Sequence, residues 1–275
     1  MTPQTIVITG ASDGIGAAAA RQLAAKGEQV VLVGRSPAKT AAVAAGLGAP
    51  YHVADFAHLD QVRGLAGELL AAYPRIEVLA NNAGGIMGGR RLTGDGFEMT
   101  FQVNHLAPFL LTHLLLPSLV AAGGAKVLNT SSVAAKRAAD IDLDDLGNER
   151  KYNPIKAYGD AKLANVLFTR ELHRRYHDQG ISTAAFHPGN VATNFASDTT
   201  SWFRYIYHTP LKRLMLISPD QGGERLTWLA EGVPGVTWQS GGYYDKDKPA
   251  STNPRADDAA LAQGLWERSA AMAGI

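Results

Sequence analysis

The sequence predicts an α/β fold, a doubly wound parallel sheet with helices on both faces. Short β-branched runs alternate with Ala- and Leu-rich stretches along the whole chain. The strand-like runs are almost continuously apolar, as expected where helices cover both faces of a sheet. No repeat, low-complexity tract or linker divides the 275 residues, so residues 1–275 are expected to form a single domain.

The elements follow one another in a regular order. The expected strands are residues 5–9, 29–33, 50–54, 76–80, 125–130, 181–186 and 242–244. The expected helices are residues 15–26, 37–46, 59–73, 97–122, 154–179 and 219–231. The apolar run 110–117 is too short for a membrane span, which needs roughly 20 apolar residues, and is expected to be a buried helix.

Two segments interrupt this alternation and are expected to form the substrate region. Residues 137–153 are polar and acidic, and residues 194–218 carry the aromatic group Phe195, Trp202, Phe203, Tyr205 and Tyr207. Long loops in compact domains are often lids or binding loops. For 194–218 we expect a lid over an apolar substrate. A subunit contact and a membrane-surface patch are the alternatives.

Bulk composition excludes several functions. A net charge of +1 gives no basic footprint for nucleic acid, and the absence of cysteine excludes disulfides, thiolate catalysis and Cys-ligated zinc. The histidine pairs 105/113 and 173/177 lack a third ligand at zinc spacing, so no metal site is expected. The first residues lack a signal-peptide pattern and no stretch could span a membrane, so a cytoplasmic location is expected.

A glycine-rich turn joins the first strand to the first helix. Gly10 permits a tight turn, Gly14 lets the backbone approach a pyrophosphate, and Gly16 permits close packing. Ser12, Asp13 and Ile15 complete this turn, and the N–H groups at the helix N-terminus attract phosphate. The strand–turn–helix context predicts a dinucleotide site.

The residue after the second strand indicates which dinucleotide is bound. An acidic residue there would accept a hydrogen bond from a ribose 2′-OH and indicate NAD. The chain has Arg35 instead, whose guanidinium can hold a 2′-phosphate with two hydrogen bonds. We therefore expect NADP(H) rather than NAD(H). The alternative is that Arg35 is simply a solvated residue after a strand, and the acidic Asp13 in the glycine turn would not attract a phosphate.

Tyr158 and Lys162 lie four residues apart in an expected helix and project from the same face. A neighbouring ammonium favours the phenolate and lowers the pKa of a tyrosine, which suits acid–base catalysis near neutral pH. Taken alone, the pair is more often structural than catalytic.

The order of the motifs resembles the short-chain dehydrogenase/reductase (SDR) family over essentially the whole chain. Its elements stand in family order as residues 9–16, Asp55, residues 81–84, Asn104, Ser131-Ser132, Tyr158 with Lys162, and Pro188-Gly189. Residues 97–106, 158–168 and 187–193 are similar to the subgroup of retinol dehydrogenases and WW-domain oxidoreductases. Pro108 departs from the pattern by interrupting the helix after Asn104.

The resemblance implies a Rossmann fold and a set of catalytic roles. Tyr158 would be the general acid or base, and Lys162 would lower its pKa and bind the nicotinamide ribose. Ser132 would orient the substrate oxygen, and Asn104 would hold a water that relays protons to Lys162. Ser132 is preferred to Ser131, which is expected to be a turn or capping hydroxyl, because it directly precedes a short Val/Ala stretch.

The resemblance also implies further cofactor contacts. Asp55 and Phe56 would flank the adenine, although Asp55 could instead cap the next helix. The remaining contacts are the turn of Asn81, Asn82, Ala83 and Gly84 beside the adenine ribose, and Pro188, Gly189, Val191 and Thr193 beside the nicotinamide.

The sequence thus predicts an NADP(H)-dependent oxidoreductase that acts on a small hydrophobic carbonyl or alcohol. An NAD-dependent alcohol dehydrogenase of the same fold and a non-catalytic NADP-binding sensor are the alternatives, and a sensor is expected to lose the Tyr/Lys pair that this chain keeps. By analogy with the family, a homo-oligomer is expected.

Overall fold

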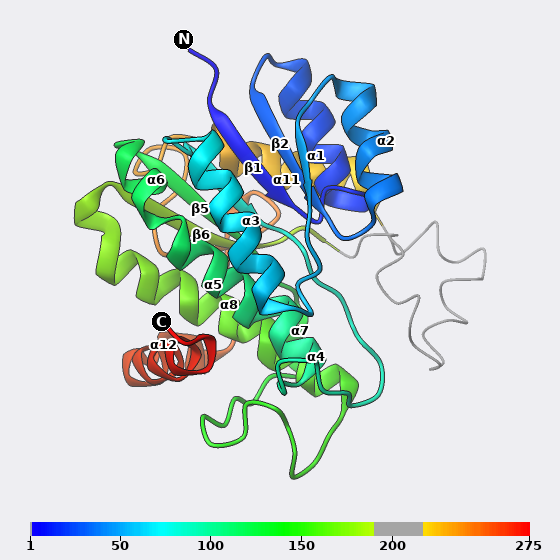
Figure 1. The fold of residues 1–275 in the computed structure, drawn as a ribbon. Coiled ribbons are helices and arrows are strands. Elements are labelled where there is room, and N and C mark those ends of the chain that lie inside the picture. The colour runs from blue at the N-terminus through cyan, green and yellow to red at the C-terminus, as the bar shows by residue number, and fades with distance from the viewer. Residues whose placement is uncertain (1, 190–216) are drawn as a thin grey trace.

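One eight-stranded sheet forms the centre of the protein. The computed structural model describes residues 2–189 and 217–275 (Figure 1). The sheet has the order β3-β2-β1-β4-β5-β6-β7-β8. The strands are β1 Thr5–Thr9, β2 Gln29–Gly34, β3 Tyr51–Val53, β4 Val78–Asn81, β5 Ala125–Thr130, β6 Ile181–His187, β7 Gly242–Asp245 and β8 Lys248–Pro249.

The prediction of a doubly wound parallel sheet is confirmed. β1 to β7 pair in parallel, and only the short edge strand β8, which the sequence did not reveal, runs antiparallel to β7. The chain adds strands on one side of β1 up to β3 and then crosses to the other side with β4. In folds of this kind, ligands bind in the crevice at such a crossing point, outside the carboxyl ends of the strands.

Helices cover both faces of the sheet (Figure 1). On one face lie α1 Gly14–Ala25, α2 Pro37–Leu47 and α11 Pro219–Glu231. On the other lie α3 Leu59–Ala72, α5 Ala107–Leu114, α8 Pro154–Tyr176 and α12 Ala259–Ala273. The alternating order of strands and helices in the sequence therefore produces two separate apolar layers, one on each side of the sheet.

The C-terminal helix α12 was not among the expected elements. It packs on α8, where Trp266 lies among Phe109 and Phe168, with ring centroids 5.0 and 5.8 Å away. Asp258 caps α12 by accepting from the N–H of Leu261 at 3.0 Å. The apolar face of α12 thus completes the larger of the two apolar cores, which lies on the side of the sheet covered by α3, α5 and α8.

The prediction of one continuous helix over 97–122 is wrong. This segment comprises α4 Met99–Phe101, the π-helical turn η1 Gln102–Leu106, α5 and α6 Leu116–Ala121. Pro108 has no N–H and cannot donate to the carbonyl of Asn104, four residues earlier. Within η1 the N–H of Ala107 instead donates to Gln102, five residues earlier. The departure noticed at Pro108 is therefore a π turn around Asn104.

Candidate active site

The residues singled out in the sequence lie at one edge of the sheet. The glycine turn follows β1, Asp55 follows β3, Asn81 ends β4, Ser131 follows β5 and Pro188 follows β6. All these strands are parallel, so their carboxyl ends meet at the same edge. The fold thus gathers residues that are as much as 178 positions apart in the sequence (Gly10 to Pro188).

The glycine turn is built so closely that side chains would not fit. Gly10 has φ +67°, and a Cβ there would lie 2.8 Å from the Cα of Ala83. A Cβ on Gly16 would lie 2.4 Å from the carbonyl oxygen of Gly10. Asn82 braces the turn by donating from Nδ2 to the carbonyl of Thr9 at 3.0 Å. Backbone therefore packs directly on backbone at Gly10 and Gly16, which is the close packing that a dinucleotide-binding turn requires.

The rest of the turn caps α1 and faces the end of β2. Asp13 is the N-cap of α1 and accepts from the N–H of Gly14 at 2.7 Å, and Ile15 is half-buried in the first turn. Ser12 lies beside Gly34, since a Cβ built on Gly34 would be 3.0 Å from the Cβ of Ser12. The residue after Gly34 is therefore adjacent to the glycine turn.

That residue, Arg35, is exposed, and no hydrogen bond or ion pair of its side chain occurs within the described residues. A second cation lies nearby, because Lys39 Nζ is 3.9 Å from the carboxylate of Asp13. Sequence reasoning missed Lys39, although its place in the first turn of α2 was the available signal. The two cations offer positive charge beside the expected adenosine end of the cofactor.

Asp55 and Phe56 occupy different environments. Asp55 Oδ1 accepts from the N–H of Ala57 at 3.0 Å and so closes a local turn. The N-cap of α3 is His58 rather than Asp55, so the capping alternative is wrong. Phe56 is 5% exposed and packs in the larger core, where its carbonyl accepts from Gln102 Nε2 at 3.2 Å. Asp55, half-buried, is the more accessible of the two to an adenine.

The turn after β4 divides its side chains between the core and the site. Asn81 is buried and donates from Nδ2 to Thr112 Oγ1 and to Asn129 Oδ1, both at 2.9 Å. Ala83 contributes its N–H to Thr9 Oγ1 at 3.0 Å. Gly84 approaches the catalytic candidates, and a Cβ there would lie 2.4 Å from Asn104 Oδ1 and 3.1 Å from Lys162 Nζ.

Tyr158 and Lys162 lie in the first half of α8. The helix begins after Asn153, whose side chain accepts from the N–H groups of Ile155 and Lys156. Lys162 Nζ is 5.5 Å from the centroid of the Tyr158 ring and donates to the carbonyl of Thr130 at 3.1 Å.

Burial decides the protonation of Lys162. The residue is 2% exposed, and loss of solvation lowers its pKa to about 7. The ammonium and the neutral amine are therefore both present near neutral pH, and the ammonium is the form that stabilises a phenolate at Tyr158.

Asn104 is fully buried inside η1 and fixes the backbone beside Lys162. Its Nδ2 donates to the carbonyls of Gly85 and Thr100 at 2.9 and 2.8 Å, and its Oδ1 accepts from the N–H of Gly85 at 2.9 Å. The amide therefore makes two opposed hydrogen bonds to Gly85. This pairing holds the segment after Asn81 against the π turn.

The two serines after β5 have different surroundings. Ser131 is buried and donates from Oγ to the carbonyl of Lys162 at 2.8 Å, which ties β5 to α8. Ser132 is half-buried, and its Oγ accepts from the N–H of Ala134 at 3.2 Å. Because that bond uses the oxygen as acceptor, the Ser132 hydroxyl proton can still be donated to a substrate oxygen.

The residues expected beside the nicotinamide are only partly within the described chain. Pro188 is buried directly after β6, and Gly189 has φ +105°. Val191 and Thr193 lie outside the described residues, as does nearly all of the expected lid 194–218.

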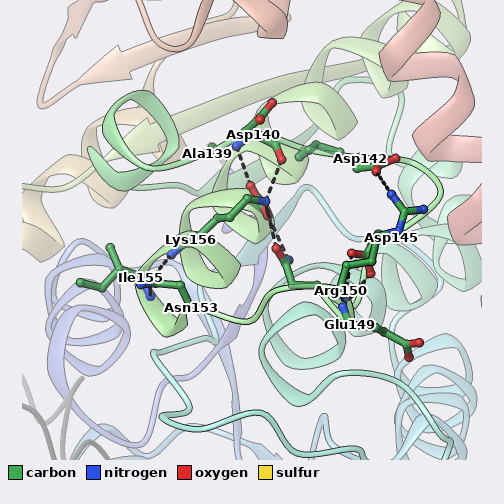
Figure 2. A network of polar contacts seen from close by, with 12 residues as sticks. Ala139, Asp140, Asp142, Asp145, Glu149, Arg150, Asn153, Ile155 and Lys156 are labelled. Atoms are coloured by element: carbon green, nitrogen blue, oxygen red, sulfur yellow. Dashed lines mark hydrogen bonds and ion pairs between the residues drawn. The ribbon is translucent and has the colours of Figure 1, made fainter.

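The polar segment 137–153 is anchored to α8 by the buried carboxylate of Asp160. Figure 2 shows the neighbouring Lys156 of α8 beside Asp140 of this segment. Asp160, two residues after Tyr158, accepts from the N–H of Asp140 at 2.7 Å, Asn148 Nδ2 at 3.0 Å and Lys156 Nζ at 2.6 Å. Lys156 also donates to the Asp140 carbonyl at 2.8 Å and to Asn148 Oδ1 at 2.9 Å. All three ammonium protons thus have acceptors, and the segment lies fixed beside the first turns of α8.

Within residues 2–189 and 217–275, no group of three or more His, Asp or Glu side chains could hold a metal ion. Nor does any helix there have the length and hydropathy needed to cross a membrane.

Comparison with known proteins identifies the family. The model of the short chain dehydrogenase family matches residues 4–203. A Streptomyces protein (strain C5) named as a candidate daunorubicin C-13 ketoreductase is 42% identical over 98% of this chain and 93% of its own. Human retinol dehydrogenase 13 is 38% identical over 99% of this chain and 85% of its own.

A solved structure shares the fold of this chain. The crystal structure of an uncharacterised protein from Mycobacterium paratuberculosis matches with a TM-score of 0.78 and 32% identity, over 98% of this chain and 93% of that one. The resemblance found in the motifs is therefore confirmed: the chain belongs to the short-chain dehydrogenase/reductase family of nicotinamide-dependent oxidoreductases, in a retinol-dehydrogenase-like subgroup.

Proposed function

We propose that this single-domain protein is an NADP(H)-dependent oxidoreductase that interconverts a small hydrophobic carbonyl compound and its alcohol. The observation that carries the proposal is the arrangement of Tyr158 and Lys162, with the Lys162 ammonium 5.5 Å from the Tyr158 ring in a buried site at the carboxyl edge of the sheet. The names of two relatives, a ketoreductase and a retinol dehydrogenase, support a carbonyl or alcohol as the substrate class.

The proposed roles follow from what each side chain can donate or accept. The bound nicotinamide would supply or accept the hydride. In the direction of reduction, the Tyr158 hydroxyl donates its proton to the substrate oxygen, and the Lys162 ammonium stabilises the phenolate that remains. Ser132 Oγ donates a hydrogen bond to the same oxygen as negative charge develops there. Asn104 and Thr130 hold the backbone and the amine in place.

A Tyr158→Phe variant tests the catalytic role. NADPH titration followed by fluorescence is expected to give the same Kd as the native protein, because the variant loses only a hydroxyl. Turnover of aromatic aldehydes, quinones and aliphatic ketones is expected to fall about 100-fold or more, as for loss of a general acid. Equal turnover in the variant would refute the mechanism. Binding without turnover in the native protein would favour an NADP-binding sensor.

Arg35 supports the choice of NADP(H) over NAD(H). Arg35 is exposed beside the glycine turn, and Lys39 adds charge near the same place. Replacing Arg35 by Ala should weaken NADPH binding about 10-fold or more while NADH binding changes little, because only NADPH carries the 2′-phosphate. An equal effect on both cofactors, or tighter native binding of NADH, would favour the NAD-dependent alcohol dehydrogenase instead.

A further inference from the structure

A chain of buried polar side chains joins the C-terminal helix α12 to Lys162. Ser269 of α12, His105 of η1 and Asn165 of α8 are 0%, 1% and 4% exposed. Polar side chains so deep in a core are costly unless each hydrogen-bonding group has a partner. The proposed function gives these three residues no role, so the geometry of their contacts is informative.

Asn165 is the branch point of this chain. Its Nδ2 donates to the carbonyl of Asn104 at 3.1 Å and to the carbonyl of Thr130 at 3.2 Å. The same Thr130 oxygen accepts from Lys162 Nζ at 3.1 Å. One side-chain amide therefore contacts both the backbone of the π turn and the acceptor that holds the Lys162 amine.

Pro108 removes the donor that the Asn104 carbonyl would have in an α-helix. That carbonyl would accept from residue 108, but residue 108 is proline and has no N–H. Asn165 donates to this carbonyl from another helix. Because the Asn104 side chain makes both hydrogen bonds to Gly85, holding the Asn104 backbone also holds that pairing.

His105 fixes which way the Asn165 amide faces. Since both N–H groups of Asn165 are used on carbonyls, its Oδ1 is the atom 3.3 Å from His105 Nδ1, which must donate. His105 Nε2 is then the acceptor for the hydroxyl of Ser269 at 3.0 Å. Burial lowers the pKa of His105 to about 4, so the ring is neutral near pH 7, as this tautomer requires.

We propose that Asn165 is a positioning residue that holds Asn104 and Lys162 in register, and that His105 and Ser269 orient its amide. The proposal rests on the proposed function, which gives Lys162 and Asn104 their importance. Among the described residues, the side-chain hydrogen bonds of Asn165 go to His105 and to the carbonyls of Asn104 and Thr130. Its effect on turnover would pass through Asn104 and the Thr130 carbonyl alone.

Asn165→Leu is the variant that tests the proposal, and Asn129→Leu is its matched control. Asn129 is just as buried, and its amide donates to Thr169 Oγ1 and accepts from Asn81, each at 2.9 Å; within the described residues its hydrogen bonds do not include Lys162 or Asn104. Both variants lose a buried amide of the same size and are expected to lower Tm. A purely structural role would therefore affect them alike.

Two readouts separate the variants. First, Asn165→Leu should lower kcat for the panel carbonyl reduced fastest by about 10- to 100-fold, as for a small misplacement of catalytic groups, whereas Asn129→Leu should keep it. Second, hydrogen exchange of the Gly85 amide in the protein without cofactor should become faster in Asn165→Leu alone, because that N–H is bonded to Asn104 Oδ1. Equal kcat and equal Gly85 exchange in the two variants would overturn the proposal.

The role of His105 is tested by rescue. His105→Gln keeps an N–H that can reach Asn165 Oδ1 and should retain most of kcat, whereas His105→Phe keeps a ring without a donor and should behave like Asn165→Leu. Equal losses in both variants would remove His105 from the proposal. Tyr158→Phe belongs in the same series: normal turnover there refutes the proposed function, while Gly85 exchange still decides the role of Asn165.

Discussion

Removing the Asp160 carboxylate is expected to destabilise the protein through the segment it anchors. In Asp160→Ala, the buried Nδ2 group of Asn148, 5% exposed, and the N–H of Asp140 lose their acceptor, and the ammonium of Lys156 loses one of its three acceptors. The Lys156 side chain is 34% exposed and can turn to water, so its share is small.

The magnitude follows from the groups that remain buried. One orphaned buried donor costs about 1–3 kcal/mol, and with a contribution from the N–H of Asp140 we expect about 2–4 kcal/mol for Asp160→Ala. For a chain of this size, each kcal/mol lowers Tm by about 2–4 °C, so Tm should fall by about 5–15 °C. Circular dichroism melting at pH 7 measures the change.

The control is Asp142→Ala in the same segment. The carboxylate of Asp142 is 2.8 Å from Arg150, but both side chains are exposed, and pairs of this kind contribute little. Its Tm should therefore move much less than that of Asp160→Ala. Trypsin should also cleave after Arg150 faster in Asp160→Ala alone, because the anchoring is local. A Tm shift no larger than that of Asp142→Ala would show that Asp160 does not anchor the segment.

Three further predictions concern stability. Gly223→Ala should destabilise by about 1–3 kcal/mol, because the new Cβ would lie 2.8 Å from the Cβ of Ala18 where α11 packs on α1. Gly67→Ala, at an exposed position of α3 with open space around it, should stabilise by about 0.5–1 kcal/mol. Urea unfolding compares the two variants, and equal effects would contradict the packing argument. Lys126→Met should lower the free energy of unfolding by about 1–3 kcal/mol in the same assay, because Lys126 Nζ donates to the carbonyls of Ala230 and Gly232 at the end of α11. An unchanged urea midpoint would show that these two hydrogen bonds do not stabilise the protein. The pKa of His105 is about 4 in the folded protein against 6.5 when unperturbed, so the unfolded chain takes up the proton at higher pH. The free energy of unfolding should therefore fall by about 3 kcal/mol as pH drops from 6.5 to 4. His105→Gln should lack that part of the pH dependence, and parallel curves of unfolding free energy against pH for the two proteins would refute it.

The strands and most helices could be predicted because their signals are local. β1 and β5 begin and end at the predicted residues, and β2, β3, β4, β6 and β7 differ from prediction by two residues or fewer at either end. The helix over 97–122 could not be predicted as it is, because helical periodicity assumes a constant number of residues per turn. The proline four residues after Asn104 was the local sign of the π turn.

The candidate site divides in the same way. The motif residues lie at one sheet edge because parallel strands require it, so their grouping could be predicted. The partners of those residues could not, since Asn165, His105 and Ser269 meet only after α8, η1 and α12 have packed. The polar segment 137–153 was predicted as a lid or binding loop, but its attachment to Asp160 depends on a helix that follows it in the sequence.

The π turn also determines the directions in which the side chains of α5 point. A π turn holds one residue more than an α turn, so the side chains of α5 are rotated by about 100° relative to an uninterrupted helix that starts at Met99. Deleting one residue between Thr100 and Leu106 would remove the extra residue, yet it would turn either Asn104 away from Gly85 or Phe109 away from Trp266. The extra residue thus lets a single helical segment face the carboxyl edge of the sheet with one end and the apolar core with the other. Insertions and deletions in this segment are for that reason less tolerable than substitutions.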